Sequence, residues 1–195
     1  MLSYVAGEAL GQPTVKLLAK PIPVLCLLLW LAPWPRGARR FVAAGLLACV
    51  AGDVLLELPG RFVAGLSAFL LGHVAYLKAF VDARRVVNPW RLAGFAAWGL
   101  SAYVFLFPGL GAMAFPVGLY VCVICAMMWR ASALLGTRFG ARGAIGAILF
   151  GLSDTLIAFD RFHEPIAGVR YPIILLYWAG QLGIAAWAHA QSRDA

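Results

Sequence analysis

The sequence predicts an all-α protein, a polytopic bundle of transmembrane helices that forms one domain over residues 1–195. Hydrophobic residues make up 63 % of the 195 residues and charged residues only 12 %, whereas a soluble domain is about half apolar and about a quarter charged. The apolar runs reach the roughly 20 residues that a helix needs to cross a bilayer. They lack the alternation of polar and apolar residues that barrel strands show. These observations exclude a soluble globule and a disordered chain.

Charges, prolines and glycines divide the chain into seven predicted spans. The first, Thr14–Trp34, ends in a proline-rich stretch. The second, Ala38–Leu58, ends just before Pro59, and the third, Arg61–Val81, ends at a charged stretch.

The fourth span, Pro89–Phe107, begins at one proline and ends before the next. The fifth, Leu110–Trp129, ends before a basic residue. The sixth, Arg142–Phe159, follows a loop of basic and small residues, and the seventh, Arg170–Ala190, follows a loop that contains Pro165.

The basic residues predict the orientation of these spans, because cytoplasmic loops carry an excess of Lys and Arg. The loops on one side hold ten of them, namely Arg36, Arg39, Arg40, Lys78, Arg84, Arg85, Arg91, Arg130, Arg138 and Arg142. The opposite loops hold three, namely Arg61, Arg161 and Arg170. The first set is therefore expected in the cytoplasm, with the C-terminus inside and the N-terminus outside. Topology also explains the net charge of +8, so no nucleic-acid partner is expected.

Two aspartates lie inside predicted spans. Asp53 is about five residues from the outer end of the second span, and Asp154 is about five residues from the outer end of the sixth. At about 1.5 Å per residue, both carboxyl groups are about 8 Å below that end. An ionisable group in the membrane costs at least about 2.5 kcal/mol, so two at one depth predict a shared polar site. The alternative is two unrelated carboxyl groups with local partners.

Other polar side chains are expected near this depth. Lys20 in the first span is a candidate counter-charge for the aspartates, or a lysine that reaches the interface. His73 and Tyr76 share a face of the third span because they are three residues apart. His73 could relay a proton, donate to a phosphate or bond a neighbouring helix.

Tyr177 and Gln181 share a face of the seventh span, and Gln181 must find a partner in an apolar setting. A role in ligand binding and a hydrogen bond between helices both fit this pair. Ser101, Tyr103 and Tyr120 are interpreted as packing or interface residues.

Three further patterns are interpreted as structural. Cys122 and Cys125 form a CxxC inside an apolar span, whereas a redox pair needs an accessible thiol. The three histidines are too scattered for a zinc site. The glycines of the sixth span lack the Lys-Ser/Thr of a phosphate loop and are expected to allow close helix packing. No metal or cofactor is expected.

Paired buried carboxyl groups suit several reactions. Burial and a neighbouring negative charge both favour the protonated form of a carboxyl group, so one aspartate could stay protonated while the other is ionised. This arrangement fits acid–base hydrolysis of an acetal-like or vinyl ether bond through an oxocarbenium-like ion. It also fits a proton-coupled transporter of lipids or solutes and an intramembrane aspartyl protease. The residues alone leave these alternatives open.

The sequence resembles the YhhN-type lysoplasmalogenases, a family of bacterial and animal membrane proteins. The resemblance runs from Lys20-Pro21 to the span of Tyr177 and Gln181. Its main segments are AGLLACVAGDVLLELP (44–59), FVAGLSAFLLGHVAYLKAF (62–80), VGLYVCVICAMMWRA (117–131) and GAIGAILFGLSDTLIAFDRF (143–162).

This resemblance implies hydrolysis of the vinyl ether bond of lysoplasmalogens, which yields a fatty aldehyde and glycerophosphoethanolamine or glycerophosphocholine. It implies Asp53 and Asp154 as the catalytic pair, because they match the family's two motif aspartates. Lys20, His73, Tyr76, Tyr177 and Gln181 match positions around its polar pocket, and we interpret them as substrate-binding residues.

The chain departs from the family pattern in two places. The family usually has eight spans against the seven predicted here, and a further span before Met1 would also explain why Lys16 and Lys20 fit an outer position poorly. Asp160 stands where an asparagine is common. The expected partners are a lysophospholipid substrate and membrane lipids, with no obligate protein partner. Arginine far outnumbers lysine, which is typical of GC-rich bacterial genomes and predicts a bacterial cytoplasmic membrane.

Overall fold

The computed structural model describes residues 10–32 and 37–191, and in this part of the chain every regular element is a helix. In chain order these are α2 (Pro13–Ala19), α3 (Ile22–Trp30), α4 (Ala38–Glu57), α5 (Phe62–Ala83), α6 (Pro89–Leu110), the short 3-10 helix η1 (Gly111–Met113), α7 (Ala114–Ser132), α8 (Gly140–Phe162) and α9 (Arg170–Gln191). The predicted all-α class is confirmed.

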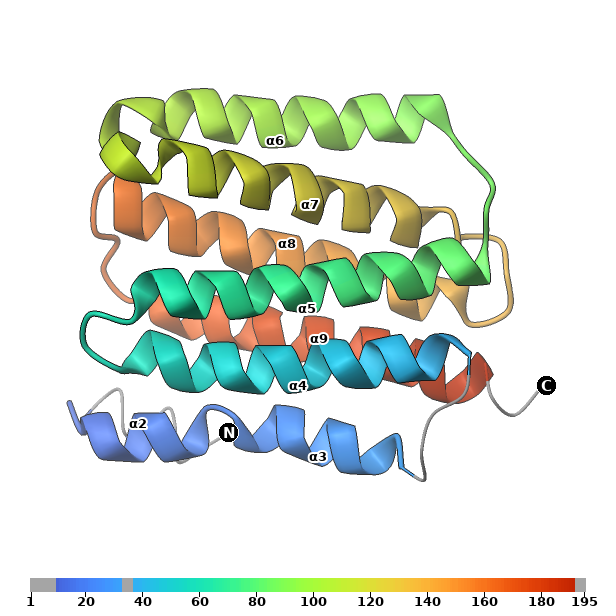
Figure 1. The fold of residues 1–195 in the computed structure, drawn as a ribbon, viewed down its shortest axis with the longest axis horizontal. Helices are drawn as coiled ribbons and strands as arrows, with labels where there is room; N and C mark the ends of the chain where they lie inside the picture. The colour runs from blue at the N-terminus through green and yellow to red at the C-terminus, as the bar shows by residue number, and fades with distance from the viewer. Residues whose placement is uncertain (1–9, 33–36, 192–195) are drawn as a thin grey trace.

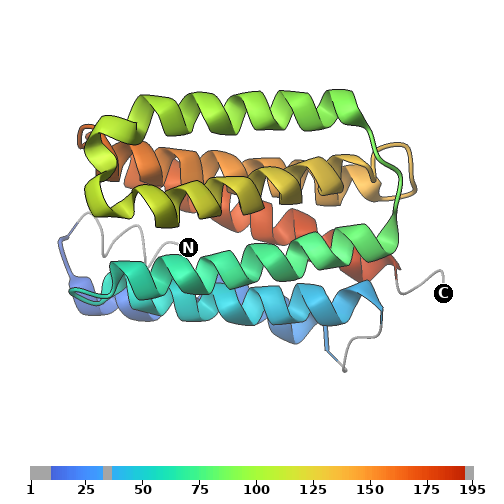
Figure 2. The same cartoon turned by 45° about the horizontal axis from the view of Figure 1, so that its top comes forward.

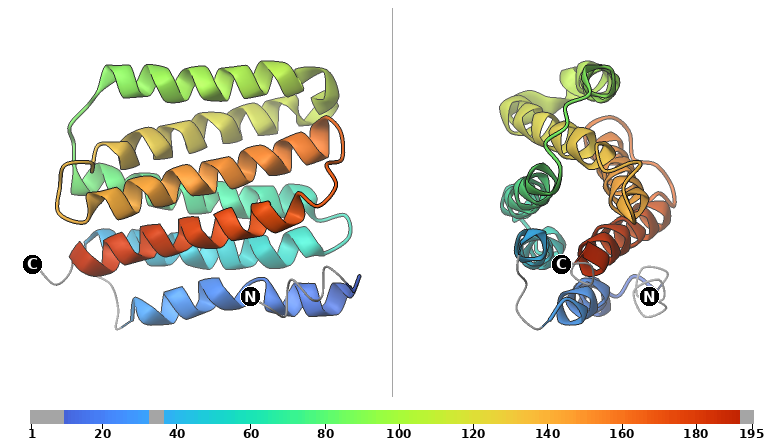
Figure 3. Two further views of the ribbon diagram at one scale, coloured as in Figure 1. Left: turned by 180° about the vertical axis from the view of Figure 1, so that it is seen from behind. Right: turned by 90° about the vertical axis from the view of Figure 1, so that its right-hand side faces the viewer.

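The long helices run antiparallel along one axis, as Figure 1 shows. We call the two ends of the bundle the Phe62 end and the Arg142 end. At the Phe62 end, the chain passes from α4 to α5 and from α8 to α9. At the Arg142 end, it passes from α5 to α6 and from α7 to α8. Seen end-on in Figure 3, α4 and α5 stand opposite α8 and α9, with α6 on one side of the bundle and α3 on the other. Helix α5 packs against both α4 and α7 (Figure 2).

The first predicted span is two helices, α2 and α3, separated at Lys20 and Pro21. A proline has no N–H for the helical hydrogen-bond ladder, and Pro23 follows in the first turn of α3. The predicted end at Trp34 lies outside the described residues. In the other predicted spans the helix bounds differ by at most about four residues. The largest difference is at the start of α7, which begins at Ala114 and not at Leu110, because α6 continues past Pro108 to Leu110.

Five segments of the described residues are long and apolar enough to cross a membrane. One of them, Pro89–Ser132, contains both α6 and α7. Helix α4 is absent from this set; it has membrane-spanning length but carries four charged side chains, namely Arg39, Arg40, Asp53 and Glu57. The chain is thus a multi-pass membrane protein, while the count of seven spans stays a prediction.

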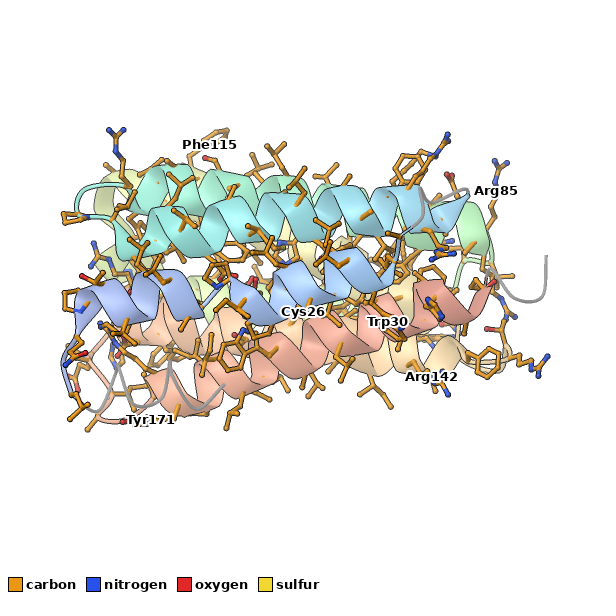
Figure 4. The ribbon with its side chains drawn as sticks, turned by 90° about the horizontal axis from the view of Figure 1, so that it is seen from below. Cys26, Trp30, Arg85, Phe115, Arg142 and Tyr171 are labelled. Atoms are coloured by element: carbon orange, nitrogen blue, oxygen red, sulfur yellow. The ribbon has the colours of Figure 1, made fainter. Side chains whose placement is uncertain are left out.

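The surface of the bundle is strongly apolar. Trp90 and Phe115 expose more than four fifths of their area, and Figure 4 shows Phe115 at the edge of the bundle, pointing away from it. The same figure shows Arg85 and Arg142 at one end and Tyr171 at the other. Water would penalise such apolar exposure, whereas lipid tails would not.

Helices α8 and α9 approach each other closely through glycines. A Cβ atom on Gly146 would lie 2.7 Å from the carbonyl oxygen of Gly180. Small residues allow such close backbone contact between membrane helices, as the sequence predicted for the glycines of α8. This packing holds Asp154 of α8 and Tyr177 of α9 in a fixed relation.

Candidate functional site

Buried polar side chains gather inside the bundle between α4, α5, α7, α8 and α9. Asp53, His73 and Gln181 have no exposed area at all. A polar group in such a place is costly unless it has a hydrogen-bond partner. The contacts of each group therefore indicate how the site is built.

Asp53 of α4 is held by one hydrogen bond. The Tyr177 hydroxyl of α9 donates to its Oδ2 atom over 2.8 Å. Its Oδ1 atom is buried and has no hydrogen-bond partner. The preceding residue, Gly52, leaves room for the Phe69 ring, which would lie 2.7 Å from a Cβ atom there. Asp53 thus has one free acceptor in a fully enclosed place.

Asp154 of α8 has a different set of neighbours. The Tyr120 hydroxyl of α7 donates to its Oδ2 atom over 2.6 Å. The Nε2 atom of His73 lies 3.4 Å from the same oxygen. About 12 % of the Asp154 side chain remains exposed, whereas His73 is enclosed.

His73 is oriented by its own helix. Its Nδ1 atom lies 2.7 Å from the Phe69 carbonyl oxygen, and a carbonyl can only accept, so Nδ1 carries a proton. In a neutral imidazole, Nε2 then has a lone pair facing Asp154. The ring also packs against Phe150, with a centroid distance of 4.5 Å, and against Tyr120 at 5.2 Å.

Tyr76 and Gln181 form a second buried pair. The Tyr76 hydroxyl donates to Gln181 Oε1 over 2.6 Å and lies 3.9 Å from the Cys49 sulfur. This bond leaves the Gln181 Nε2 atom as a buried donor with no partner. Both sequence alternatives for Gln181 stay open, because it bonds a neighbouring helix and also has a free donor.

Aromatic contacts connect the surroundings of the two carboxyl groups, because Phe150 packs against both Tyr177, which bonds Asp53, and His73, which lies beside Asp154. Phe150 packs against Tyr177 with a centroid distance of 5.2 Å, and Phe69 against Tyr177 at 5.7 Å. Among the described residues no hydrogen bond joins Asp53 to Asp154. The structure thus gathers both aspartates into one cluster of side chains, in two different environments.

Lys20 forms an ion pair with Glu57, and no hydrogen bond to either aspartate is seen. Its Nζ atom lies 3.0 Å from Glu57 Oε1, and both side chains are largely buried. Glu57 follows Asp53 by one helical turn on the same face of α4. The Lys20 carbonyl, left at the break between α2 and α3, accepts a hydrogen bond from Trp178 Nε1 over 3.3 Å.

An apolar cavity of about 80 Å³ lies between α5, α6, α7 and α8. Its walls are mainly aliphatic and aromatic, and among the residues that line it Asp154 is the one acidic or basic side chain. Tyr120, which bonds Asp154, also lines it. A carboxyl group on an apolar wall can act on an apolar ligand that displaces water from around it.

Two residues of this site were not assigned to it from the sequence. The sequence favours a packing or interface position for Tyr120, but its hydroxyl bonds Asp154. A buried tyrosine hydroxyl normally needs a hydrogen-bond partner, and this requirement predicts such a bond. Glu57 was not singled out, although its place one turn after Asp53 predicts a shared helix face. Tyr103 donates to the Ala114 carbonyl, and Ser101 is exposed.

No group of three or more His, Cys, Asp or Glu side chains that could hold a metal is found in the described part of the chain. Cys122 is exposed and Cys125 is buried, and both are free thiols.

Comparison with known proteins gives consistent matches. The sequence pattern of the YhhN family matches residues 15–188. Lysoplasmalogenase TMEM86B of Homo sapiens is 34 % identical over 180 residues, covering 85 % of this chain and 71 % of that protein. Lysoplasmalogenase TMEM86A of Bos taurus is 36 % identical over 197 residues, covering 92 % and 80 %. The lysoplasmalogenase of Mycobacterium bovis is 31 % identical over 194 residues, covering 94 % and 72 %. No solved structure gives a significant match.

Proposed function

Because the chain belongs to the YhhN family, we propose that it is a lysoplasmalogenase, a hydrolase that cleaves the vinyl ether bond of lysoplasmalogens. The products are a fatty aldehyde and a glycerophospho alcohol such as glycerophosphoethanolamine or glycerophosphocholine. The observation that carries this proposal is Asp154 on the wall of an otherwise apolar cavity. Such a cavity suits an alkyl chain, and the carboxyl group suits proton transfer to the bond beside it.

Vinyl ether hydrolysis begins with a proton. Asp154 transfers its proton to the vinyl carbon that bears the alkyl chain, and the electron pair of the double bond forms the new C–H bond. The other vinyl carbon and its oxygen become an oxocarbenium ion. Water adds to that carbon and loses a proton to a carboxylate. The hemiacetal hydroxyl then loses its proton as the carbon–oxygen bond to glycerol breaks, the glycerol oxygen takes up a proton, and the aldehyde is released.

Neighbouring groups prepare Asp154 for this step. The Tyr120 hydroxyl fixes one carboxyl oxygen, which limits the orientations of the acid. The Nε2 atom of His73 faces that oxygen and can hold a proton between turnovers. We propose that His73 returns the proton to Asp154.

Asp53 is proposed to stabilise the positive charge of the oxocarbenium ion and to orient the attacking water. Its carboxylate, held by Tyr177, lowers the energy of the cationic intermediate across the aromatic cluster, where charges are weakly screened. Its free Oδ1 atom and the free Nε2 atom of Gln181 are an acceptor and a donor suited to orienting water. Tyr76 positions Gln181 for this role.

The proposed setting is the cytoplasmic membrane of a bacterium, as the arginine-rich composition predicts. A lysophospholipid would reach the site from the membrane itself, so no protein partner is needed.

The test uses purified protein in detergent with two substrates, a lysoplasmalogen and an ester-linked lysolipid of the same chain length and headgroup. We expect aldehyde from the first and no fatty acid from the second. Fatty acid from the ester-linked lysolipid, with no aldehyde from the lysoplasmalogen, would indicate an esterase. In liposomes, substrate uptake that depends on a proton gradient and forms no product would instead establish a transporter.

A further inference from the structure

Arg161 lies at the Phe62 end of the cavity that contains Asp154. It is the second-to-last residue of α8, and its side chain is exposed. Its guanidinium group stacks over the Phe62 ring, 4.9 Å from the ring centroid. Phe62 and Phe162, whose rings meet edge to face at 6.0 Å, both line the cavity. The cation thus lies against Phe62, which forms part of the cavity wall.

Arg161 and Asp154 share one face of α8. They are seven residues apart, which is about two turns and about 10 Å along the helix axis. In a lysoplasmalogen, seven bonds separate the phosphorus from the vinyl carbon that receives the proton. An extended chain gains about 1.2 Å per bond, so this separation is about 8 Å. A substrate with its vinyl carbon at Asp154 therefore brings its phosphate close to Arg161.

Two neighbouring charged groups at this end are already engaged. Lys20 is paired with Glu57. Asp160, next to Arg161, accepts a hydrogen bond from the Ile166 N–H over 2.9 Å and so stays with its own loop. Among the described residues no carboxylate forms an ion pair with Arg161. Stacking on Phe62 restricts the guanidinium group, whose planar donors suit a phosphate.

We propose that Arg161 binds the phosphate of the lysophospholipid substrate and sets the depth at which its vinyl bond meets Asp154. This inference rests on the proposed function for the identity of the substrate. The ligand class is a single-chain lipid with an anionic phosphate, its chain in the apolar cavity and its phosphate on Arg161.

The test measures binding, so that it does not depend on hydrolysis. The probes are a saturated 1-alkyl lysophospholipid, which has no vinyl bond to cleave, and the matching 1-alkylglycerol, which has no phosphate. We expect Arg161→Gln to weaken binding of the lysophospholipid about ten- to a hundredfold, as loss of a charge-assisted contact implies. Binding of the alkylglycerol should not change. Arg161→Lys should recover only part of the loss, because a lysine lacks the planar fork.

Arg61→Gln is the matched control, since it removes an equal charge beside Phe62 from a residue with an exposed side chain. Binding to Arg61→Gln should equal that of the wild type. If Arg161→Gln bound the lysophospholipid with wild-type affinity, the assignment would be overturned. An equal loss of affinity in Arg161→Gln and Arg61→Gln would also overturn it, because it would indicate a general attraction to the positive surface. If the wild type released no aldehyde but its lysophospholipid binding still depended on Arg161, the hydrolase proposal would be overturned and the phosphate site would be supported.

Discussion

The two aspartates occupy opposite kinds of place, although the sequence sets them at the same depth. Asp53 follows a glycine, is fully enclosed and bonds Tyr177. Asp154 follows a serine, lines an apolar cavity and bonds Tyr120, with His73 beside it. Depth along a helix therefore does not decide which carboxyl group a ligand can reach; the neighbouring helices do. This difference supports the proposal that Asp154 transfers the proton and that Asp53 stabilises charge.

Of the substitutions that test this comparison of the two aspartates, one at Asp154 should have the largest effect. Asp154→Asn keeps the shape and removes the proton that the reaction needs, so we expect kcat/KM for aldehyde release to fall about a thousandfold. Gel filtration and the thermal unfolding midpoint should show a folded protein. A folded Asp154→Asn variant with more than a tenth of wild-type activity would contradict the assignment.

Asp53→Asn is expected to have a smaller effect. Loss of its charge removes stabilisation of the intermediate but leaves the proton donor in place, so kcat should fall about a hundredfold with little change in KM. Initial rates at several substrate concentrations separate the two constants. If Asp53→Asn were more damaging than Asp154→Asn, the two roles would have to be exchanged.

The hydroxyl groups that hold the acid come next. Tyr120→Phe removes the hydrogen bond to Asp154 and should lower kcat about tenfold. Tyr103→Phe is its matched control, because Tyr103 also lines the cavity but donates to the Ala114 carbonyl. Equal losses in the two variants would point to a packing effect in place of a role for the Tyr120 hydroxyl.

The smallest expected effect concerns the cavity wall. Ala102 of α6 lines the cavity, and Ala102→Leu should raise KM for long-chain substrates about fivefold, since it fills space that the alkyl chain needs. Ala97→Leu adds the same bulk at an exposed position of α6 outside the lining. The effect is measured as KM for substrates with a series of alkyl-chain lengths. If Ala102→Leu changed KM equally for short and long alkyl chains, the alkyl chain would have to bind outside this cavity.

The sequence predicted much of the fold because each long helix is encoded locally. Runs bounded by Pro59, Pro89 or a charged stretch give helix limits within a few residues. The break at Lys20 and Pro21 was missed because apolar composition continues across it. The equal depth expected for Asp53 and Asp154 rests on helical rise alone and stays a prediction.

Contacts across helices could not be read in the same way. Tyr120 and Asp154 are 34 residues apart in sequence, and nothing local to either shows that they meet. Lys20 is a candidate counter-charge for the aspartates, and its charge does act on Asp53. Its ion pair, however, is with Glu57. Such pairings depend on how helices rotate and pack, which a single sequence leaves open.

The central claim is that a fixed acid, Asp154, protonates the vinyl carbon. Wild-type protein in D₂O should convert a lysoplasmalogen to an aldehyde with one deuterium on the carbon next to the carbonyl group. Rapid reduction to the alcohol would preserve the label for mass spectrometry and NMR. We predict one deuterium, added to a single face of that carbon, because one fixed donor supplies it. Aldehyde without deuterium there, or with deuterium on both faces equally, would contradict the account.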